Sequence, residues 1–189
     1  MHNNNHLPTK IYFHVMPFDR KHPEFITITC LEWKHFLKHD ACKRIIIDAL
    51  IYRVMNEQLK LFGFVIMPNH MHLIWKISND IEQQDFQRDF LKYTAKGMLT
   101  YLKAHDEFLY AESEVNDKDR HRQIWERNSL SKEIFTEEFC KQKLNYIHNN
   151  PLQEKWNLAT QPEDYYWSSA SYYLNNDSRW RFLSHYRYD

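Results

Sequence analysis

The apolar positions of this chain recur with two different periods, which predict strands and helices in a definite order. Apolar runs of strand length occupy residues 10–16, 25–29 and the two arms of a hairpin at 60–77. Apolar residues at helical spacing occupy residues 41–58, 85–105 and 136–149. Read in order, these elements predict an α+β fold in which two helices alternate with pairs of strands.

The remaining segments carry weaker patterns. Residues 31–39 are consistent with a short helix, and the charge-dense stretch at 106–122 indicates a mobile loop or a short exposed helix. Short strands are predicted at 124–127 and 134–135, on either side of a polar turn.

The hairpin holds the first candidate chemistry. A strand-length apolar run at 61–66 is broken at Met67-Pro68-Asn69, and the chain is apolar again from His70 onward. Because side chains alternate along a strand, His70 and His72 share one face with Ile74, at ~7 Å from each other along the backbone. Two imidazoles in this arrangement can converge on one divalent ion, whereas a single histidine here would be an ordinary core residue.

The helix ending at Asn149 is well delimited by the sequence. Thr136, with two glutamates behind it, is a suitable N-cap, and Pro151 ends the helix because the residue before a proline is pushed out of the helical region. Its inward stripe consists of Cys140, Leu144 and Ile147.

Tyr146 lies off that stripe. It falls near one line with Lys143 and Asn150, so a phenol, an ammonium and a carboxamide can face the same space. By spacing alone, however, such a tyrosine is an ordinary residue at the rim of an amphipathic helix.

Composition narrows the class of protein. With 25 basic and 25 acidic residues, the formal net charge is zero, which argues against coating nucleic acid by bulk electrostatics. A local basic site is still compatible: Arg88, Lys92 and Lys96 share one face of the helix at 85–105, either as a solvated face or as a stripe that tracks phosphates.

The chain should be a soluble, cytoplasmic protein without a membrane segment. No apolar run approaches the ~18 residues that a membrane helix needs, and the polar start lacks the order of a signal peptide. The three cysteines have no paired spacing and are interpreted as small buried hydrophobes.

Two stretches taken together resemble the REP-associated tyrosine transposases, a branch of the single-strand HUH transposase superfamily. They are Gly63-Phe64-Val65-Ile66-Met67-Pro68-Asn69-His70-Met71-His72-Leu73-Ile74-Trp75 and Tyr146-Ile147-His148-Asn149-Asn150-Pro151. HUH denotes two histidines around a hydrophobic residue, as at 70–72. Weaker matches at 85–96, 124–125 and 162–169 follow in the right order, so the resemblance spans a single domain at 10–174, with a flexible leader at 1–9 and a tail at 175–189.

The resemblance implies a ferredoxin-like core with a central antiparallel sheet that carries the HUH strand and helices packed on one face. It implies that His70 and His72 bind a divalent cation, Mg²⁺ or Mn²⁺, although two histidines alone would also take zinc. Asn150 would complete the protein ligands, and Tyr146 would be the nucleophile. The implied activity is cleavage and rejoining of single-stranded or hairpin DNA ends through a covalent 5′-phosphotyrosine, with the protein at the nucleoid when bound to DNA.

Several roles stay open. His148 points away from Tyr146 on the helix, so a water is as good a base for the phenol. Lys143 is a candidate for steadying the phosphate, and His14 is better explained by core packing. The oligomeric state, monomer or homodimer, and action of the tyrosine on its own or a partner's metal site are equally open.

Other protein classes fit less well. A histidine-dependent nucleotide hydrolase with a His-x-His-x-His strand would have a third histidine where Ile74 stands. Replication initiators and relaxases with the same strand are larger chains. A DNA-binding regulator that kept the fold but lost transposition remains the main alternative. One departure from the family is Trp156-Asn157, where the family commonly has a glycine turn.

Overall fold

The computed structural model describes residues 21–187, and its centre is a four-stranded antiparallel sheet in the order β2-β3-β1-β4. The strands are β1 (Glu24–Thr29), β2 (Leu59–Ile66), β3 (His70–Ile77) and β4 (Leu130–Glu133). β2 and β3 form the predicted hairpin, and β1 pairs with β3 so that Thr27 lies opposite His72. The strand predicted at 10–16 lies outside the described residues.

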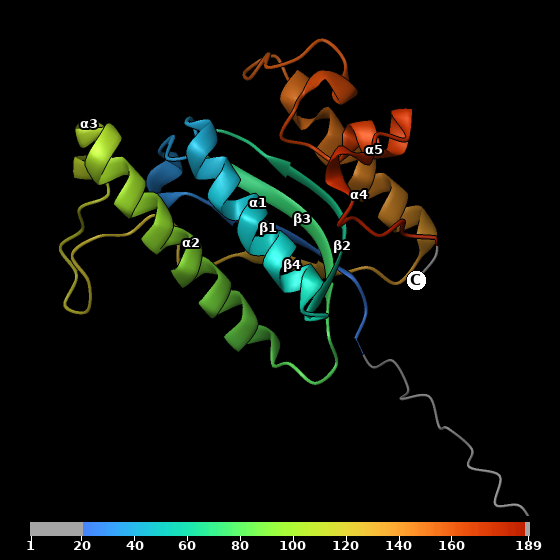
Figure 1. Cartoon of the computed structure of the whole chain (residues 1–189), viewed down its shortest axis with the longest axis horizontal. Coiled ribbons are helices and arrows are strands. Elements are labelled where there is room, and N and C mark those ends of the chain that lie inside the picture. Colours follow the sequence, from blue (N-terminus) through green and yellow to red (C-terminus); the bar gives the residue numbers. More distant parts are fainter. Residues whose placement is uncertain (1–20, 188–189) are drawn as a thin grey trace, which may run out of the picture.

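Helices cover both faces of this sheet (Figure 1). α1 (Asp40–Met55) and α2 (Gln83–His105) lie side by side on one face, and α4 (Glu137–Asn149) lies on the other. The expected ferredoxin-like α+β core is confirmed, with α1 and α2 as the helices on its one face and α4 added opposite them. Short helices α3 (Glu107–Glu112) and α5 (Ala170–Asn175) complete the set, with 3-10 turns at Leu31–Trp33, Asn150–Leu152, Pro162–Asp164 and Ser178–Trp180.

Alternation along β3 divides the core into two layers. Met71, Leu73 and Trp75 pack against α1 and α2, whereas Ile74 faces α4. β2 and β3 are therefore buried on both faces, which explains why their sequences read as continuous apolar runs and not as a polar alternation.

α4 approaches the sheet closely because β2 carries a glycine at the contact. A Cβ on Gly63 would lie 2.6 Å from Leu144 Cδ2 and 3.2 Å from Ile147 Cδ1, so both α4 side chains would have to move. The C-terminal segment is tied to the same strand, since Tyr165 Oη donates to the carbonyl of Ile66 at 2.8 Å and Tyr173 Oη to that of Phe62 at 2.6 Å.

Several boundaries agree with the sequence and others do not. Thr136 caps α4 as predicted, accepting from the Phe139 amide at 3.1 Å, and the charge-dense stretch contains α3. The strands predicted at 124–127 and 134–135 are wrong: β4 is the polar segment between them, and Trp125 forms only a single bridge with Cys30. β4 is exposed along its length and is held by backbone pairing with β1, so it has no apolar pattern to recognise. In 31–39 a single 3-10 turn replaces the short helix.

The cysteines are buried and unpaired, as expected. Between residues 21 and 187, none of the helices has both the length and the apolar character that crossing a membrane requires.

Candidate functional site

His70 and His72 lie at the start of β3, directly after the hairpin turn, on the face that α4 covers. Both side chains are buried, and their ring centroids are 4.8 Å apart at an interplanar angle of 74°. The strand alternation inferred from the sequence thus brings the two imidazoles together.

A hydrogen bond at Nδ1 orients each ring. His70 Nδ1 lies 2.8 Å from Asn69 Oδ1, and His72 Nδ1 lies 2.9 Å from Thr27 Oγ1. Asn69 Nδ2 donates to the Trp33 carbonyl at 3.0 Å, which turns the amide oxygen toward His70. Because that oxygen can only accept, His70 carries its proton on Nδ1 and keeps a lone pair on Nε2.

Burial keeps both imidazoles neutral. It lowers the pKa of His70 to about 4, helped by the charge of Lys155, while the neighbouring Asn150 carboxamide acts in the opposite direction. Burial lowers the pKa of His72 to about 3, helped by His70 and by Lys143. At neutral pH both rings are uncharged bases, which is the form that binds a metal ion.

Asn150 joins the histidines from the end of α4. Its side chain is 2% exposed, and its Oδ1 has no hydrogen-bond partner among residues 21–187; the same is true of His72 Nε2. Buried polar atoms without partners are rare in native proteins and point to a missing ligand.

These atoms fit a divalent cation. Two neutral imidazole nitrogens and one carboxamide oxygen form a mixed donor set that leaves coordination positions for water and substrate oxygens. No group of three or more His, Cys, Asp or Glu side chains with metal-site geometry exists in the described part of the chain, so the third protein ligand would have to be this carboxamide.

Tyr146 stands beside the histidines on the exposed edge of α4. Its ring meets that of His72 edge-on, with centroids 5.2 Å apart, and its side chain is 46% exposed. The phenol is therefore next to the buried imidazole pair and open to solvent.

Lys143 lies one turn before Tyr146. Its Nζ is 4.6 Å from the centroid of the Phe25 ring and 5.7 Å from that of Tyr146. The ammonium thus lies close to the phenol and close enough to His72 to lower the pKa of that ring.

The site includes residues to which the sequence patterns gave no role there. Asn69 and Thr27 orient the imidazoles, and Lys155 contributes charge near His70. The ring of Trp156 lies 5.8 Å from that of His70, and Asn157 adopts a φ of 44°. Asparagine tolerates this left-handed conformation. Asn69 directly precedes His70 in the chain, whereas the other residues reach the histidines only through the tertiary fold.

His148 points away from the site, as its position on the helix predicts. Its Nε2 lies 2.8 Å from Ser169 Oγ, and burial lowers its pKa to about 4. It is therefore not placed to take the proton of Tyr146. His14 lies outside the described residues.

His148 should make the protein acid-sensitive. The pKa of His148 falls from about 6.5 in the unfolded chain to about 4 in the folded one. Between pH 4 and 6.5 the unfolded chain therefore binds more protons than the folded chain. The free energy of unfolding should be fully retained above pH 6.5 and should fall, on the order of 3 kcal/mol from this residue, as the pH drops from about 6.5 to about 4. Urea titrations in EDTA should show a flatter pH dependence for His148→Gln than for wild type.

Carboxylates also titrate in this range, and they are common to all variants. His121→Gln, which removes an exposed histidine, is the matched control and should follow wild type. Identical acid profiles for His148→Gln and wild type would contradict the assignment.

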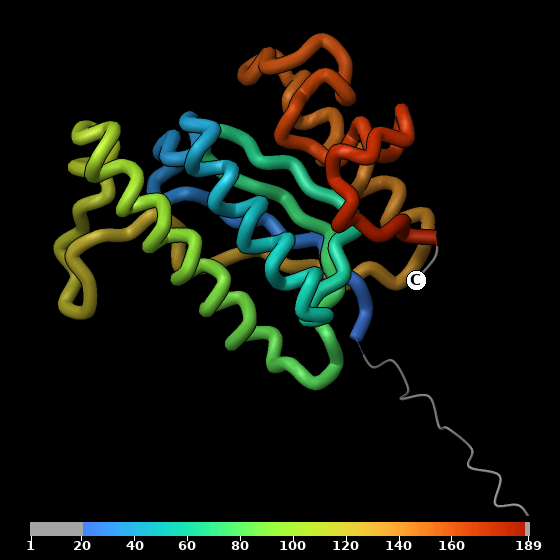
Figure 2. The backbone as a smooth tube through the Cα atoms, in the orientation of Figure 1, coloured from blue at the N-terminus to red at the C-terminus, as the bar shows by residue number. Residues whose placement is uncertain are grey.

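The basic row on α2 is not part of this constellation. Arg88, Lys92 and Lys96 line a groove of about 1050 Å³ whose other wall is the segment at 119–127, on the side of the sheet opposite the histidines. The backbone trace in Figure 2 shows the course of α2 and of this segment. Seven basic side chains and two acidic ones line it. Arg88 is paired with Asp85 at 2.6 Å.

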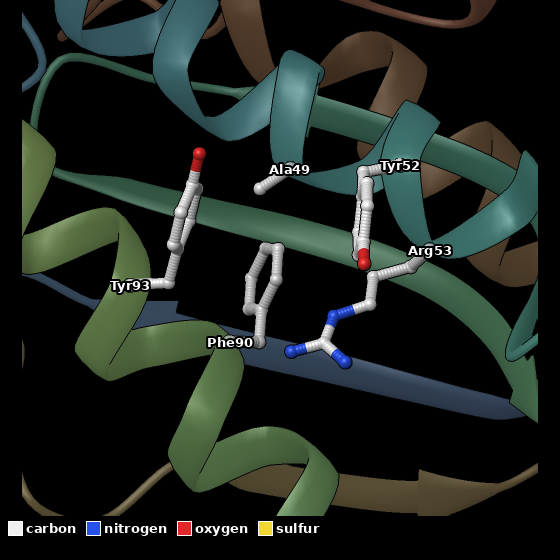
Figure 3. A pocket seen from close by; sticks show the side chains of 5 residues that line it. All are labelled: Ala49, Tyr52, Arg53, Phe90 and Tyr93. Atoms are coloured by element: carbon white, nitrogen blue, oxygen red, sulfur yellow. The ribbon is translucent and has the colours of Figure 1, made fainter. Parts of the chain in front are cut away.

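A smaller pocket of about 120 Å³ lies between α1 and α2 (Figure 3). Tyr52 and Tyr93 border it, with Ala49 and Phe90 between them and Arg53 at one side. It lies on the sheet face away from His70 and His72 and shares no residue with their site.

Comparisons with known proteins identify the fold. A solved REP-associated tyrosine transposase, bound to a REP hairpin, aligns over 79% of this chain and 76% of its own with a TM-score of 0.55 and 18% identity. A Deinococcus radiodurans R1 protein assigned as a transposase aligns over 67% of this chain and 88% of its own, with a TM-score of 0.45 and 17% identity. No protein family and no curated protein matches the chain. At the level of fold, the first structure confirms the resemblance drawn from the two motifs.

Proposed function

We propose that this chain is a REP-associated tyrosine transposase, which cleaves and rejoins single-stranded or hairpin DNA through a 5′-phosphotyrosine. The observation that carries the proposal is the meeting of two neutral imidazoles, an unpartnered carboxamide oxygen and a solvent-open phenol. These come from His70, His72, Asn150 and Tyr146. The fold shared with a transposase adds to it.

The divalent cation would be Mg²⁺ or Mn²⁺, held by the Nε2 atoms of His70 and His72 and by Oδ1 of Asn150. Bound there, it would withdraw charge from a nonbridging oxygen of the scissile phosphate. Asn69 and Thr27 keep the two imidazoles turned for this task through their Nδ1 atoms.

Tyr146 performs the nucleophilic step. Its phenolic oxygen attacks phosphorus, and the proton passes to water, which reaches the exposed side chain. The bond between phosphorus and the 3′-oxygen breaks, and that oxygen takes a proton and leaves as a 3′-hydroxyl. The downstream strand stays joined to the tyrosine through its 5′-phosphate, so attack by another 3′-hydroxyl reverses the step and rejoins DNA.

Lys143 stabilises the negative charge that develops on the phenol and the phosphate in this step. Its ammonium lies beside the Tyr146 ring, where it favours a developing phenolate and attracts the phosphate.

Parts of the DNA that are remote from the cleaved phosphate would bind in the groove between α2 and the segment at 119–127. Lys92 and Lys96 form no ion pair with another residue in 21–187, and the groove is basic although the whole chain is neutral. Because this groove lies on the other face of the sheet, Arg88, Lys92 and Lys96 would hold a part of the substrate away from Tyr146.

The test is a covalent adduct assay with a pool of hairpin DNAs that carry randomised single-stranded flanks, in Mg²⁺ or Mn²⁺. A 3′-end label should transfer to the protein and a 5′-end label should not, because the tyrosine keeps the downstream strand. Transfer of the 5′ label would contradict the proposed polarity. DNA binding without any adduct would favour the alternative of a regulator with the same fold.

Asn69 offers a finer test of the metal site. Asn69→Ala removes the acceptor that fixes the His70 tautomer, so Mn²⁺ affinity should fall about 10- to 100-fold in calorimetric titrations. Asn149→Ala, which removes an exposed carboxamide bonded to the Asn145 carbonyl, is the matched control. Equal Mn²⁺ affinity for Asn69→Ala and wild type, with both folded by circular dichroism, would contradict this role.

A further inference from the structure

The turn between β1 and α1 presents an exposed indole to the histidine site. Glu32 and Trp33 are successive non-glycine residues, and both have left-handed backbone conformations, with φ of 51° and 58°. Such a conformation is unfavourable for residues other than glycine and persists only where surrounding structure holds it.

Hydrogen bonds hold this turn on both sides. The Leu31 amide donates to the Ile124 carbonyl at 2.8 Å, and the Glu32 amide donates to Glu126 Oε1 at 2.7 Å. The Trp33 carbonyl accepts from Asn69 Nδ2 at 3.0 Å. Because Asn69 also orients His70, the indole and the imidazole are positioned by one side chain.

Packing does not explain the position of the indole. Trp33 is 58% exposed, whereas the other five tryptophans are buried or half-buried. Its ring centroid lies 5.9 Å from that of His70, which is its one ring contact among residues 21–187. Strained backbone of this kind is concentrated at functional sites, and here it keeps a large aromatic ring in water beside the histidines.

The rings form an ordered series across the site. Trp33 contacts His70, His70 contacts His72, and His72 contacts Tyr146, at centroid separations of 5.9, 4.8 and 5.2 Å. Trp33 and Tyr146 therefore occupy the two ends of the imidazole pair.

We propose that Trp33 is a stacking platform for a nucleobase of single-stranded DNA next to the cleaved phosphate, on the side of the metal site away from Tyr146. This inference rests on the proposed function, and it adds the position of the single-stranded DNA relative to the metal site. An unstacked base presents an apolar face of the size of an indole, and stacking of this kind tolerates any base. Trp33 is thus a residue that binds and positions substrate.

Binding of a fluorescein-labelled dT12 oligonucleotide, followed by anisotropy in EDTA, tests the platform without cleavage. Trp33→Leu should weaken binding on the order of 5- to 150-fold, the range that one stacked base supplies. Trp33→Phe, which keeps a π face, should recover most of the affinity. Tyr52→Leu, which removes an equally exposed ring from α1 on the other sheet face, should bind like wild type.

An abasic dodecamer separates stacking from damage to the turn. Wild type and Trp33→Leu should bind this backbone equally, because it has no bases to stack. In addition, dT12 should quench tryptophan emission of the wild type, and Trp33→Phe should lose that quenching.

Two results would overturn the inference: wild-type affinity of Trp33→Leu for dT12, or an equal loss for dT12 and the abasic strand. The covalent adduct assay is independent of both. An adduct in wild type together with unchanged dT12 binding in Trp33→Leu would reject stacking and leave the transposase proposal intact. Base-dependent quenching without any adduct would support stacking on Trp33 and reject the transposase proposal.

Discussion

Tyr146→Phe is expected to abolish the covalent protein–DNA adduct while leaving the fold and DNA binding unchanged. The variant removes only the phenolic oxygen, and its ring still packs edge-on against His72 and Phe25. Loss of the nucleophile of a covalent mechanism should lower the rate of adduct formation by at least about 10³-fold. Gel electrophoresis of 3′-labelled hairpin DNA after denaturation measures the adduct.

A matched tyrosine provides the control for this result. Tyr93→Phe removes the hydroxyl of an exposed tyrosine on α2, on the other face of the sheet, and should form the adduct at the wild-type rate. Persistence of the adduct in Tyr146→Phe would mean that another side chain attacks the phosphate. Failure of both tyrosine variants would point to a general loss of activity.

The second large effect is expected for the double variant His70→Ala, His72→Ala. Both imidazoles are neutral at pH 7, so their removal takes away the nitrogen donors and should lower Mn²⁺ affinity by at least about 100-fold. The rise in melting temperature that Mn²⁺ produces in wild type should vanish with it, since a ligand stabilises only the protein that binds it.

The variant also loses the Nδ1 hydrogen bonds to Asn69 and Thr27, so its metal-free fold is compared with wild type by circular dichroism before metal is added. His148→Gln is the control: it removes a buried histidine from the same region and should bind Mn²⁺ like wild type. Unchanged Mn²⁺ affinity in the double variant would reject the metal site.

The geometry of the fold explains how the two halves of the site meet. The histidines are on β3 in the middle of the sheet, whereas Tyr146 is on α4 and Asn150 directly follows that helix, far along the chain. α4 reaches the histidine face because β2 offers Gly63 at the contact and because its own Leu144 and Ile147 are apolar. A larger side chain at position 63 would alter the separation of α4 from the sheet and thereby the site itself.

Some features of the fold and the site can be predicted from the sequence and others cannot, for physical reasons. The hairpin, the cap at Thr136 and the shared face of His70 and His72 follow from local periodicity and from hydrogen bonding near the backbone. β4 was missed because strand pairing at a sheet edge needs no apolar side chains. The basic row on α2 was visible, but its groove partners at 119–127 were not, because a groove needs two walls.

By itself, the sequence determined the type and order of the longer elements, β1, α1, β2, β3, α2 and α4, and which side chains of each share a face, since these depend on short-range periodicity. It also carried the two motifs that resemble a transposase. Only the tertiary structure decided that α4 covers the histidine face, that Asn150 lies beside His70 and that Asn69 links His70 to an exposed Trp33. Those relations depend on packing and hydrogen bonds between distant segments, which no local pattern in the chain encodes.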